Sequence, residues 1–133
     1  MKKTRFAGIY NAQNILACTL VANEMKICSK RTTKYLQNID GLSHRIEFYK
    51  EISGVRFIDD SKSTSAQSLK AGLGSFEKPV ILIAGGSEKG DPFENMEDIF
   101  ARQIKHAEFI GQTKHILGAI CDKVKKPYHY SES

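Results

Sequence analysis

The sequence has no tryptophan, only three prolines and only three cysteines among its 133 residues. An odd number of cysteines without C-x-x-C pairing excludes the disulfide framework of a small secreted domain, and it is typical of reduced thiols in a cytosolic protein. No apolar run approaches the roughly 18 residues that a membrane-spanning helix needs. The basic start is followed by a stretch too polar for a signal peptide, because Tyr10, Asn11 and Gln13 interrupt it. These features predict a cytoplasmic protein without a membrane partner.

A phosphate-binding P-loop and a metal-ligand motif are also missing. The pattern G-x-x-x-x-G-K-[ST], whose backbone cradles nucleotide phosphates, does not occur in the chain. The four histidines and the three cysteines show no spacing that is typical of metal ligands. We therefore predict no P-loop and no metal site made by this chain alone.

The positive charge is unevenly spread. The net charge is +5, and residues 1–44 carry all of it, with seven Lys and Arg against two Asp and Glu. A basic segment can indicate a nucleic-acid partner. However, these basic residues are not interleaved with aromatic side chains that could stack on bases, and no nucleic-acid-binding motif is visible. A solvated basic face is the better interpretation, so we expect no nucleic acid as a partner.

The stretch over residues 54–93 has the pattern of a strand, a helix and a second strand. Residues 55–58 are apolar or β-branched apart from one arginine, and they predict a short buried strand. Thr64 and Gln67 have the spacing of a helix-capping box. Apolar residues then recur on one helical face; they are Ala66, Leu69, Leu73 and Phe76. The apolar run 80–84 predicts a second buried strand, and we expect both strands to be parallel in one sheet.

Two polar loops follow these strands, D-D-S-K-S-T at 59–64 and G-G-S-E-K-G at 85–90. In βαβ units, ligands bind at the carboxyl ends of the strands. Each loop places a lysine, Lys62 or Lys89, among small polar groups at that edge, which predicts an anion-binding site. The alternative is that the first loop only caps a helix and that both lysines are solvated.

The first part of the chain has the pattern of two helices. Apolar residues keep a helical period over 12–25, and Asn11 is of a residue type that caps helices. Asn14 follows almost one turn later, so two carboxamides lie at the same helix end, either as a binding feature or as ordinary polar residues. A second helix is predicted over 29–39. Two helices cannot make a closed core, so we predict a domain boundary near residue 42.

Strands and helices alternate in the rest of the chain. Apolar and polar residues alternate over 46–52, which predicts a strand, and Ser53-Gly54 predicts a hairpin turn into the next strand. Further helices are predicted over 94–104 and 115–124, and further strands over 107–110 and 127–130. The expected fold class is α/β, with a Rossmann-like mixed sheet in which a parallel βαβ unit has an antiparallel edge strand, preceded by a short helical segment.

Four motifs resemble the Mur ligase family, and within it the members that add D-glutamate. In family order, they are G-I-Y-N-A-Q-N (8–14), G-L-S-H-R (41–45), G-V-R-F-I-D-D-S-K-S-T (54–64) and L-I-A-G-G-S-E-K-G (82–90). The D-S-K-x-T piece discriminates, because sister ligases that add other amino acids carry different residues there. The resemblance implies a three-domain protein. Of this protein the chain would hold the helical tail of the central ATPase domain (1–42) and part of the C-terminal Rossmann-like domain (43–133).

The resemblance also implies which residues contact the nucleotide. Asn11 and Asn14 would line the adenine. Arg45 and Asp60 would hold the ribose and the phosphates, and a carboxylate suits ribose hydroxyls because it only accepts hydrogen bonds. Lys62 would lie near the transferred phosphate, and it is the implied catalytic residue.

Two further residues would contact the amino-acid substrate, and two positions depart from the family pattern. Thr64 and Lys89 would bind the carboxylates of D-glutamate. Tyr10 stands where the family usually has histidine, and Asp59 stands where it usually has asparagine. The second departure adds a negative charge beside the expected anion site.

The implied function is that of a fragment of an ATP-dependent ligase. Such a ligase joins D-glutamate to UDP-N-acetylmuramoyl-L-alanine through an amide bond in peptidoglycan synthesis. ATP and Mg²⁺ are implied for the full-length enzyme, and we expect neither to be held by this chain alone. The muramoyl substrate would be bound through the missing domains. The alternative is a free-standing Rossmann-like module that binds a nucleotide or an acidic metabolite without catalysis.

Overall fold

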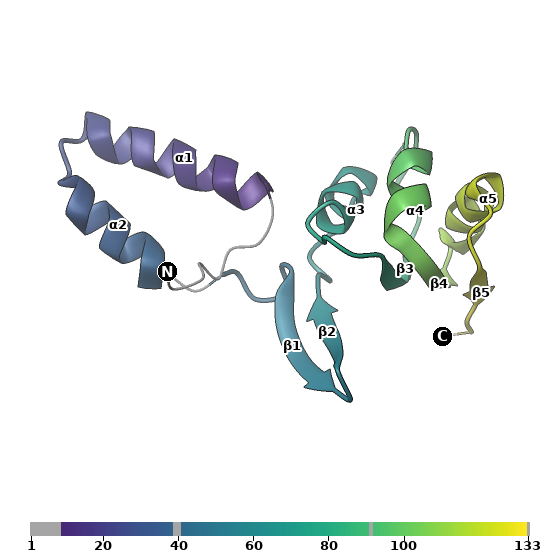
Figure 1. The fold of residues 1–133 in the computed structure, drawn as a ribbon. Helices are drawn as coiled ribbons and strands as arrows, with labels where there is room; N and C mark the ends of the chain where they lie inside the picture. Colours follow the sequence, from purple (N-terminus) through teal and green to yellow (C-terminus); the bar gives the residue numbers. More distant parts are fainter. Residues whose placement is uncertain (1–8, 39–40, 91, 133) are drawn as a thin grey trace. The chain divides into compact units, whose positions relative to one another are not determined.

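The computed structural model describes residues 9–38, 41–90 and 92–132 (Figure 1). Contacts between residues divide the chain into two compact units, Met1–Lys62 and Ser63–Ser133. In the described part of the chain, no helix is long and apolar enough to cross a membrane.

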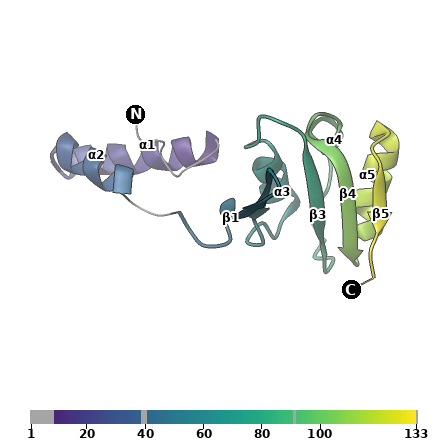
Figure 2. The same cartoon turned by 60° about the horizontal axis from the view of Figure 1, so that its bottom comes forward.

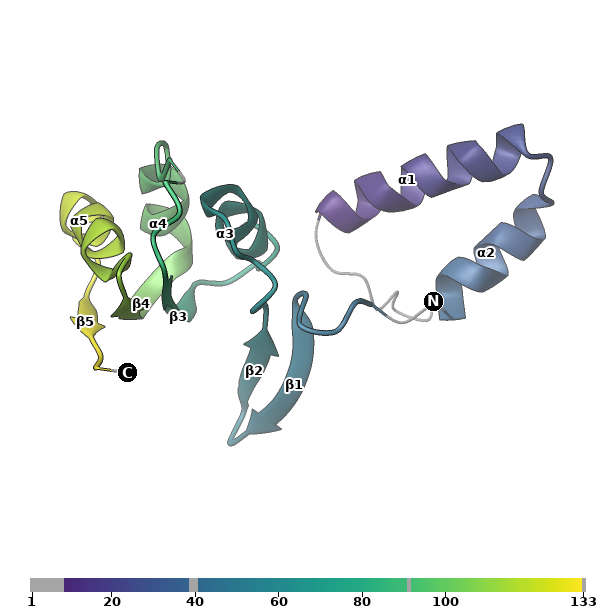
Figure 3. The same cartoon turned by 180° about the vertical axis from the view of Figure 1, so that it is seen from behind.

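The first unit begins with two helices, α1 (Ile9–Glu24) and α2 (Ser29–Asn38), seen from behind in Figure 3. Both predicted helices are confirmed to within a few residues. However, α1 begins before Asn11, so this residue lies in the first turn and is not the cap that the sequence pattern predicts. Between the helices, Lys26 has a left-handed φ of 57°, and its amide donates to the Asn23 carbonyl at 2.9 Å. Ile39, the last residue of the second predicted helix, lies outside the described residues.

A hairpin follows in the same unit. Strand β1 (Glu47–Ile52) pairs antiparallel with β2 (Val55–Asp59). The two residues between them, Ser53 and Gly54, have φ values of 50° and 79°. Positive φ at both positions is the mark of the two-residue turn that matches the twist of a hairpin. The predicted strand, turn and strand are therefore confirmed.

The strands form two sheets, where the sequence pattern predicts one. β1 and β2 make a two-stranded antiparallel sheet, and the parallel sheet of the second unit has the order β3-β4-β5. The α/β fold class, with parallel strands and an antiparallel pair, is confirmed, but the pair is not the edge of the parallel sheet. Val55 and Phe57 are exposed, so the expectation of a buried β2 is wrong. An apolar pattern indicates a strand without indicating which strand pairs with it.

In the second unit, α3 (Ala66–Leu73) starts one residue later than the capping pattern predicts. Ser65 is the cap: its backbone is extended, and its Oγ accepts the amide of Ser68 at 3.2 Å. The hydroxyl of Ser68 in turn accepts the amide of Ser65 at 3.0 Å. This reciprocal pair is the capping box, and it replaces the predicted pair of Thr64 and Gln67. The serine pair satisfies two amides that the helix itself leaves unbonded.

The parallel sheet consists of β3 (Val80–Gly86), β4 (Ile104–Gly111) and β5 (Tyr128–Tyr130), which lie side by side in Figure 2. Helix α4 (Glu97–Gln103) connects the first two strands, and α5 (Lys114–Val124) connects the last two. The continuous apolar run predicts a buried β3, but Ile81 and Ile83 are 62% and 72% exposed. One face of this strand therefore packs on the core and the other is open.

The core of the second unit lies between the sheet and its helices. Its central residues include Met96, Ile99, Phe100 and Ile104. Ile104 itself is the first residue of β4, so the helix is shorter than the predicted range 94–104. Ala107 and Phe109 of β4, and Leu117, Ile120 and Cys121 of α5, complete the cluster.

Candidate functional site

Two loops that are distant in sequence are joined in the first unit. The loop before β1 contains His44 and Ile46. Asp59 is the last residue of β2, and Asp60 begins the loop after it. Nδ1 of His44 lies 2.8 Å from Oδ2 of Asp59, and the amide of Ile46 donates to Oδ1 of Asp60 at 3.0 Å. Because β1 and β2 are antiparallel, the start of one strand lies beside the end of the other. The hairpin thus brings together the second and third motifs of the sequence.

Backbone hydrogen bonds fix the same two loops. The amide of Lys62 donates to the carbonyl of His44 at 3.0 Å, and the amide of His44 donates to a carboxylate oxygen of Glu47 at 2.7 Å. His44 and Ile46 have φ values of 63° and 49°, in the left-handed region that side chains other than glycine seldom adopt. Backbone strain of this kind is found preferentially at binding and catalytic sites. Arg45 lies between these two residues, in the middle of the strained segment.

The carboxylate of Asp59 is held in its charged form. Its hydrogen bond with His44, followed by the bond from the amide of Ser61 at 2.9 Å, lowers the pKa of Asp59 to about 2. Hydrogen bonds to a carboxylate favour the charged form because that form is the stronger acceptor. The additional negative charge at this position thus has partners within the hairpin.

The structure groups the seven residues singled out from the sequence into three places. Arg45, Asp60 and Lys62 lie on the two joined loops. The other four are divided between helix α1, which carries Asn11 and Asn14, and the second unit, which carries Thr64 and Lys89. Asn11 is half-buried and Asn14 is exposed.

The loop that carries Lys89 starts from the carboxyl end of β3. Gly85 has a φ of 145°, and a Cβ at this position would collide with the carbonyl oxygen of Ile110 on β4. Only glycine permits this close approach of the two strands. Beyond it, the carbonyl of Gly86 accepts the amides of Gln112 and Thr113 at 2.9 and 3.1 Å. These contacts fix the start of the loop, while Lys89 itself is exposed.

A hollow of about 410 Å³ lies at the carboxyl ends of β4 and β5. It is lined by Gly111, Gln112, Lys114, His115, Ser131 and Glu132. This is the edge of a parallel sheet at which α/β proteins bind their ligands. None of these residues stood out in the sequence, because they come from the ends of two strands and from the start of α5.

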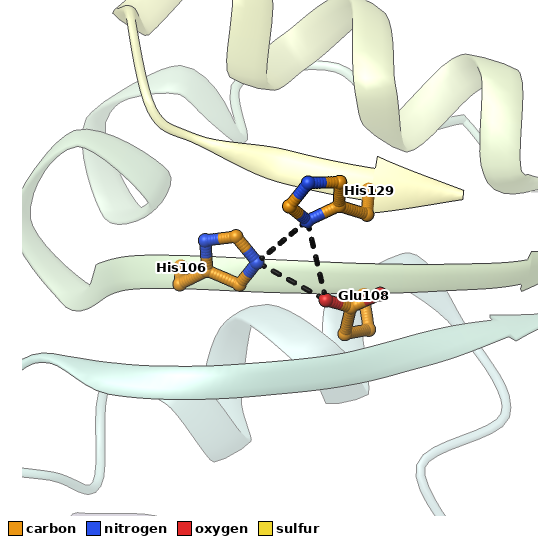
Figure 4. A group of neighbouring side chains, drawn as sticks. All are labelled: His106, Glu108 and His129. Carbon is orange, nitrogen blue, oxygen red and sulfur yellow. Dashed lines mark hydrogen bonds and ion pairs between the residues drawn. The ribbon is translucent and has the colours of Figure 1, made fainter. Parts of the chain in front are cut away.

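A second group that spacing in the sequence did not reveal lies on the sheet itself. His106 and Glu108 are two residues apart on β4, and His129 is the register partner of Glu108 on β5. Figure 4 shows the three side chains pointing toward one another. Nε2 of His106 lies 3.1 Å from Oε1 of Glu108 and 3.2 Å from Nδ1 of His129. Strand periodicity places the first two on one face, but only the pairing of β4 with β5 adds the third.

Comparison with known proteins shows which proteins have a sequence similar to this chain. No protein-family profile matches the chain. A UDP-N-acetylmuramoylalanine–D-glutamate ligase of Caldicellulosiruptor saccharolyticus is 40% identical over 119 residues, which are 90% of this chain and 26% of that protein. A ligase of the same name from Clostridium botulinum is 39% identical over 124 residues, which are 92% of this chain and 27% of that protein.

Solved structures agree on the fold. UDP-N-acetylmuramate-alanine ligase MurC from Thermotoga maritima matches with a TM-score of 0.74 and 15% identity over 96% of this chain and 30% of that chain. MurF from Acinetobacter baumannii matches with a TM-score of 0.72 and 19% identity, over 96% of this chain and 29% of that chain. The chain spans about a quarter of the length of the curated relatives that it matches. This chain is thus similar in sequence to part of proteins named UDP-N-acetylmuramoylalanine–D-glutamate ligase, and similar in fold to part of MurC and MurF.

Proposed function

We propose that this chain is a segment of a cytoplasmic, ATP-dependent ligase that adds D-glutamate to UDP-N-acetylmuramoyl-L-alanine in peptidoglycan synthesis. The supporting observation is 39–40% identity, over 90–92% of the chain, to proteins named UDP-N-acetylmuramoylalanine–D-glutamate ligase. Three unpaired cysteines agree with a reducing compartment. The relatives are named as ligases, so a free-standing binding module is not favoured.

We assign residues 1–42 to the end of the central ATPase domain and residues 43–133 to part of the C-terminal domain. Large apolar side chains that are exposed in both units support a missing remainder; they include Leu16, Leu20, Phe48, Ile81 and Ile83. Soluble proteins seldom leave so many large apolar side chains open to water. In the proposed full-length ligase, further parts of the protein cover these side chains, and their absence here leaves the side chains exposed.

In this proposal, the joined loops of the hairpin hold the phosphate and ribose side of ATP. Arg45 and Lys62 supply exposed cations, and Asp60 supplies the carboxylate for the ribose. The donor set suits a nucleotide, because a guanidinium and an ammonium bind phosphate oxygens while a carboxylate accepts from hydroxyls. Bound ATP supplies the phosphoryl group that activates a substrate carboxylate. Lys62 acts by placing positive charge beside the oxygens of that group.

The remaining contacts come from three further segments. Asn11 and Asn14 lie one turn apart on α1, so their carboxamides are on the same side of the helix, where they suit the adenine edge. Thr64 and Lys89 offer a hydroxyl and an ammonium for the two carboxylates of D-glutamate. The Mg²⁺ of the full-length enzyme, and the site for the UDP-linked substrate, belong in this proposal to parts of the ligase outside this chain.

The size of the protein in its source cells tests the proposal. An antibody against residues 54–93 should detect a protein of roughly 45–50 kDa, the mass of three domains of ordinary size. Purified with that antibody, the protein should form the amide product only when ATP, D-glutamate and the UDP-linked substrate are all present. A band near the 14.9 kDa of this chain, or a full-length protein without that activity, would overturn the proposal.

A further inference from the structure

The cluster of His106, Glu108 and His129 (Figure 4) is independent of the proposed ligase function. On β4, Ala107 and Phe109 point into the core, and strand alternation puts His106 and Glu108 on the opposite, open face of the sheet. The side chain of His129 is 72% exposed, and those of His106 and Glu108 are 28% and 34% exposed. In this chain, an ion from solution can therefore reach all three side chains.

The three facing atoms have the spacing of metal ligands. Nε2 of His106, Oε1 of Glu108 and Nδ1 of His129 are separated by 3.1, 3.2 and 3.4 Å. Ligand atoms that surround a tetrahedral ion at about 2.0–2.1 Å are themselves about 3.3 Å apart. The three atoms thus form the base of a coordination shell without any movement of the backbone.

Hydrogen bonds cannot satisfy all three contacts at once. An imidazole nitrogen carries either a proton or a lone pair, and a carboxylate oxygen only accepts. If both nitrogens are protonated, two N–H groups face each other across 3.2 Å; if one is not, its lone pair faces that of the carboxylate. A metal ion accepts a lone pair from each of the three atoms, which removes this conflict.

The surroundings of Glu108 are those of a metal ligand. Its second oxygen, Oε2, accepts the hydroxyl of Ser131 at 3.1 Å, which fixes the orientation of the carboxylate. Metal-ligating carboxylates are usually oriented by such an outer hydrogen bond. Two imidazoles and one carboxylate suit Zn²⁺ and its late first-row neighbours, and they suit Mg²⁺ or Ca²⁺ poorly. We propose that His106, Glu108 and His129 form a binding site for one divalent transition-metal ion, with the remaining coordination positions open to water.

Calorimetric titration of the untagged chain with Zn²⁺ tests the site. We expect one Zn²⁺ per chain, and we expect at least about tenfold weaker binding in His106→Gln, Glu108→Gln and His129→Gln, since even outer-shell changes cost about 10–100-fold in metal affinity. His115→Gln is the matched control, because His115 is also exposed but lies on α5 outside the cluster. It should keep the affinity of the unmodified chain.

A second measurement identifies the bound groups. In NMR spectra, one equivalent of Zn²⁺ should shift the imidazole signals of His106 and His129 and leave those of His115 in place. A second group of possible ligands, His44, Glu47 and Asp59, lies on the hairpin. Absence of Zn²⁺ binding, equal binding by the three variants and the unmodified chain, or loss of the ion in His44→Gln but not in His129→Gln would overturn the proposal.

Discussion

Nδ1 of His44 lies 2.8 Å from Oδ2 of Asp59, although the two residues are 15 positions apart in the chain. The contact joins the two ends of the hairpin, and it gives a partner to Asp59, at which the resemblance to Mur ligases leads us to expect asparagine. The negative charge of Asp59, beside the expected phosphate site, is thus stabilised by hydrogen bonds from the imidazole of His44 and the amide of Ser61. We infer that His44 positions the loop that carries Asp60 and Lys62.

The pKa of Asp59 is the first quantity that can be checked. It is lowered from 3.8 to about 2, chiefly by the hydrogen bond with His44. Because the folded value is the lower one, the stabilisation from this carboxylate is present above pH 3.8 and is lost as the pH falls toward 2. An NMR titration of the side-chain carboxyl carbon should give the low pKa directly.

A histidine variant separates the causes of that shift. In His44→Ala, the pKa of Asp59 should rise toward 3.8, and the remaining difference reports the hydrogen bonds from the amide and the side chain of Ser61. In the control His115→Ala, the pKa of Asp59 should stay low, because His115 lies in the other unit. An unchanged pKa in His44→Ala would show that the imidazole does not hold the carboxylate.

The sequence pattern predicts the elements of this fold well and their partners less well. Local signals, such as the alternation over 46–52 and the Ser53-Gly54 turn, depend on neighbouring residues, and the structure confirms them. The pairing of strands depends on contacts between distant segments, so the division into two sheets was not visible. The capping box shifted by one residue because both Thr64 and Ser65 offer a hydroxyl, and only the backbone geometry decides between them.

The candidate site shows the same difference between local sequence signals and contacts between distant segments. Motifs indicated Arg45, Asp60 and Lys62, and the hairpin joins the loops that carry them. The group of His106 and His129 could not be found from spacing, because 22 residues separate the two histidines and a whole helix lies between them. A search for His-x-Glu on one strand, combined with the register of the next strand, would have been needed.

A core substitution tests where the second unit obtains its stability. Phe100 is fully buried, and Phe100→Ala should lower the free energy of unfolding by about 3–5 kcal/mol through lost burial and the cavity left behind. Ile81→Ala, on the open face of β3, should change it by less than about 0.5 kcal/mol. Urea unfolding of the two variants measures both values. Equal losses would mean that the open face is covered in solution.

Gly85 tests the close approach of β3 and β4. Both Gly85 and Gly86 have φ values near 146°, so a side chain strains the backbone at either position. Only at Gly85 would the new Cβ also collide with the carbonyl of Ile110; at Gly86 nothing lies within 4 Å. Gly85→Ala should therefore be less stable than Gly86→Ala by about 1–3 kcal/mol in urea unfolding. Equal stability of the two variants would contradict this strand geometry.

The three cysteines should differ in reactivity. Cys18 and Cys28 are exposed on the first unit, whereas Cys121 is fully buried in the core. Burial raises the pKa of the Cys121 thiol to about 11, which suppresses the reactive thiolate at neutral pH. A chromogenic disulfide reagent at pH 7.5 should modify Cys18 and Cys28 in the folded chain, and it should modify Cys121 only after unfolding. Rapid modification of Cys121 in the folded chain would show that α5 detaches from the sheet.

Lys62 provides the sharpest test of the ligase proposal. Its amide is fixed by the carbonyl of His44, while its side chain is exposed at the loop that we assign to the transferred phosphate. In the full-length protein, Lys62→Ala should lower the turnover by roughly 10²-fold or more, since a positioned charge of this kind stabilises the transition state by several kcal/mol. The matched control is Lys78→Ala, which should keep the original rate; Lys78 is also exposed, and it lies on a loop of the second unit. Because Lys62 is exposed, its loss should leave the thermal unfolding temperature unchanged, so a reduced rate can be assigned to chemistry and not to misfolding. If Lys62→Ala and the control have equal rates, Lys62 has no catalytic role, and its contribution is limited to the hydrogen bond from its amide to the carbonyl of His44.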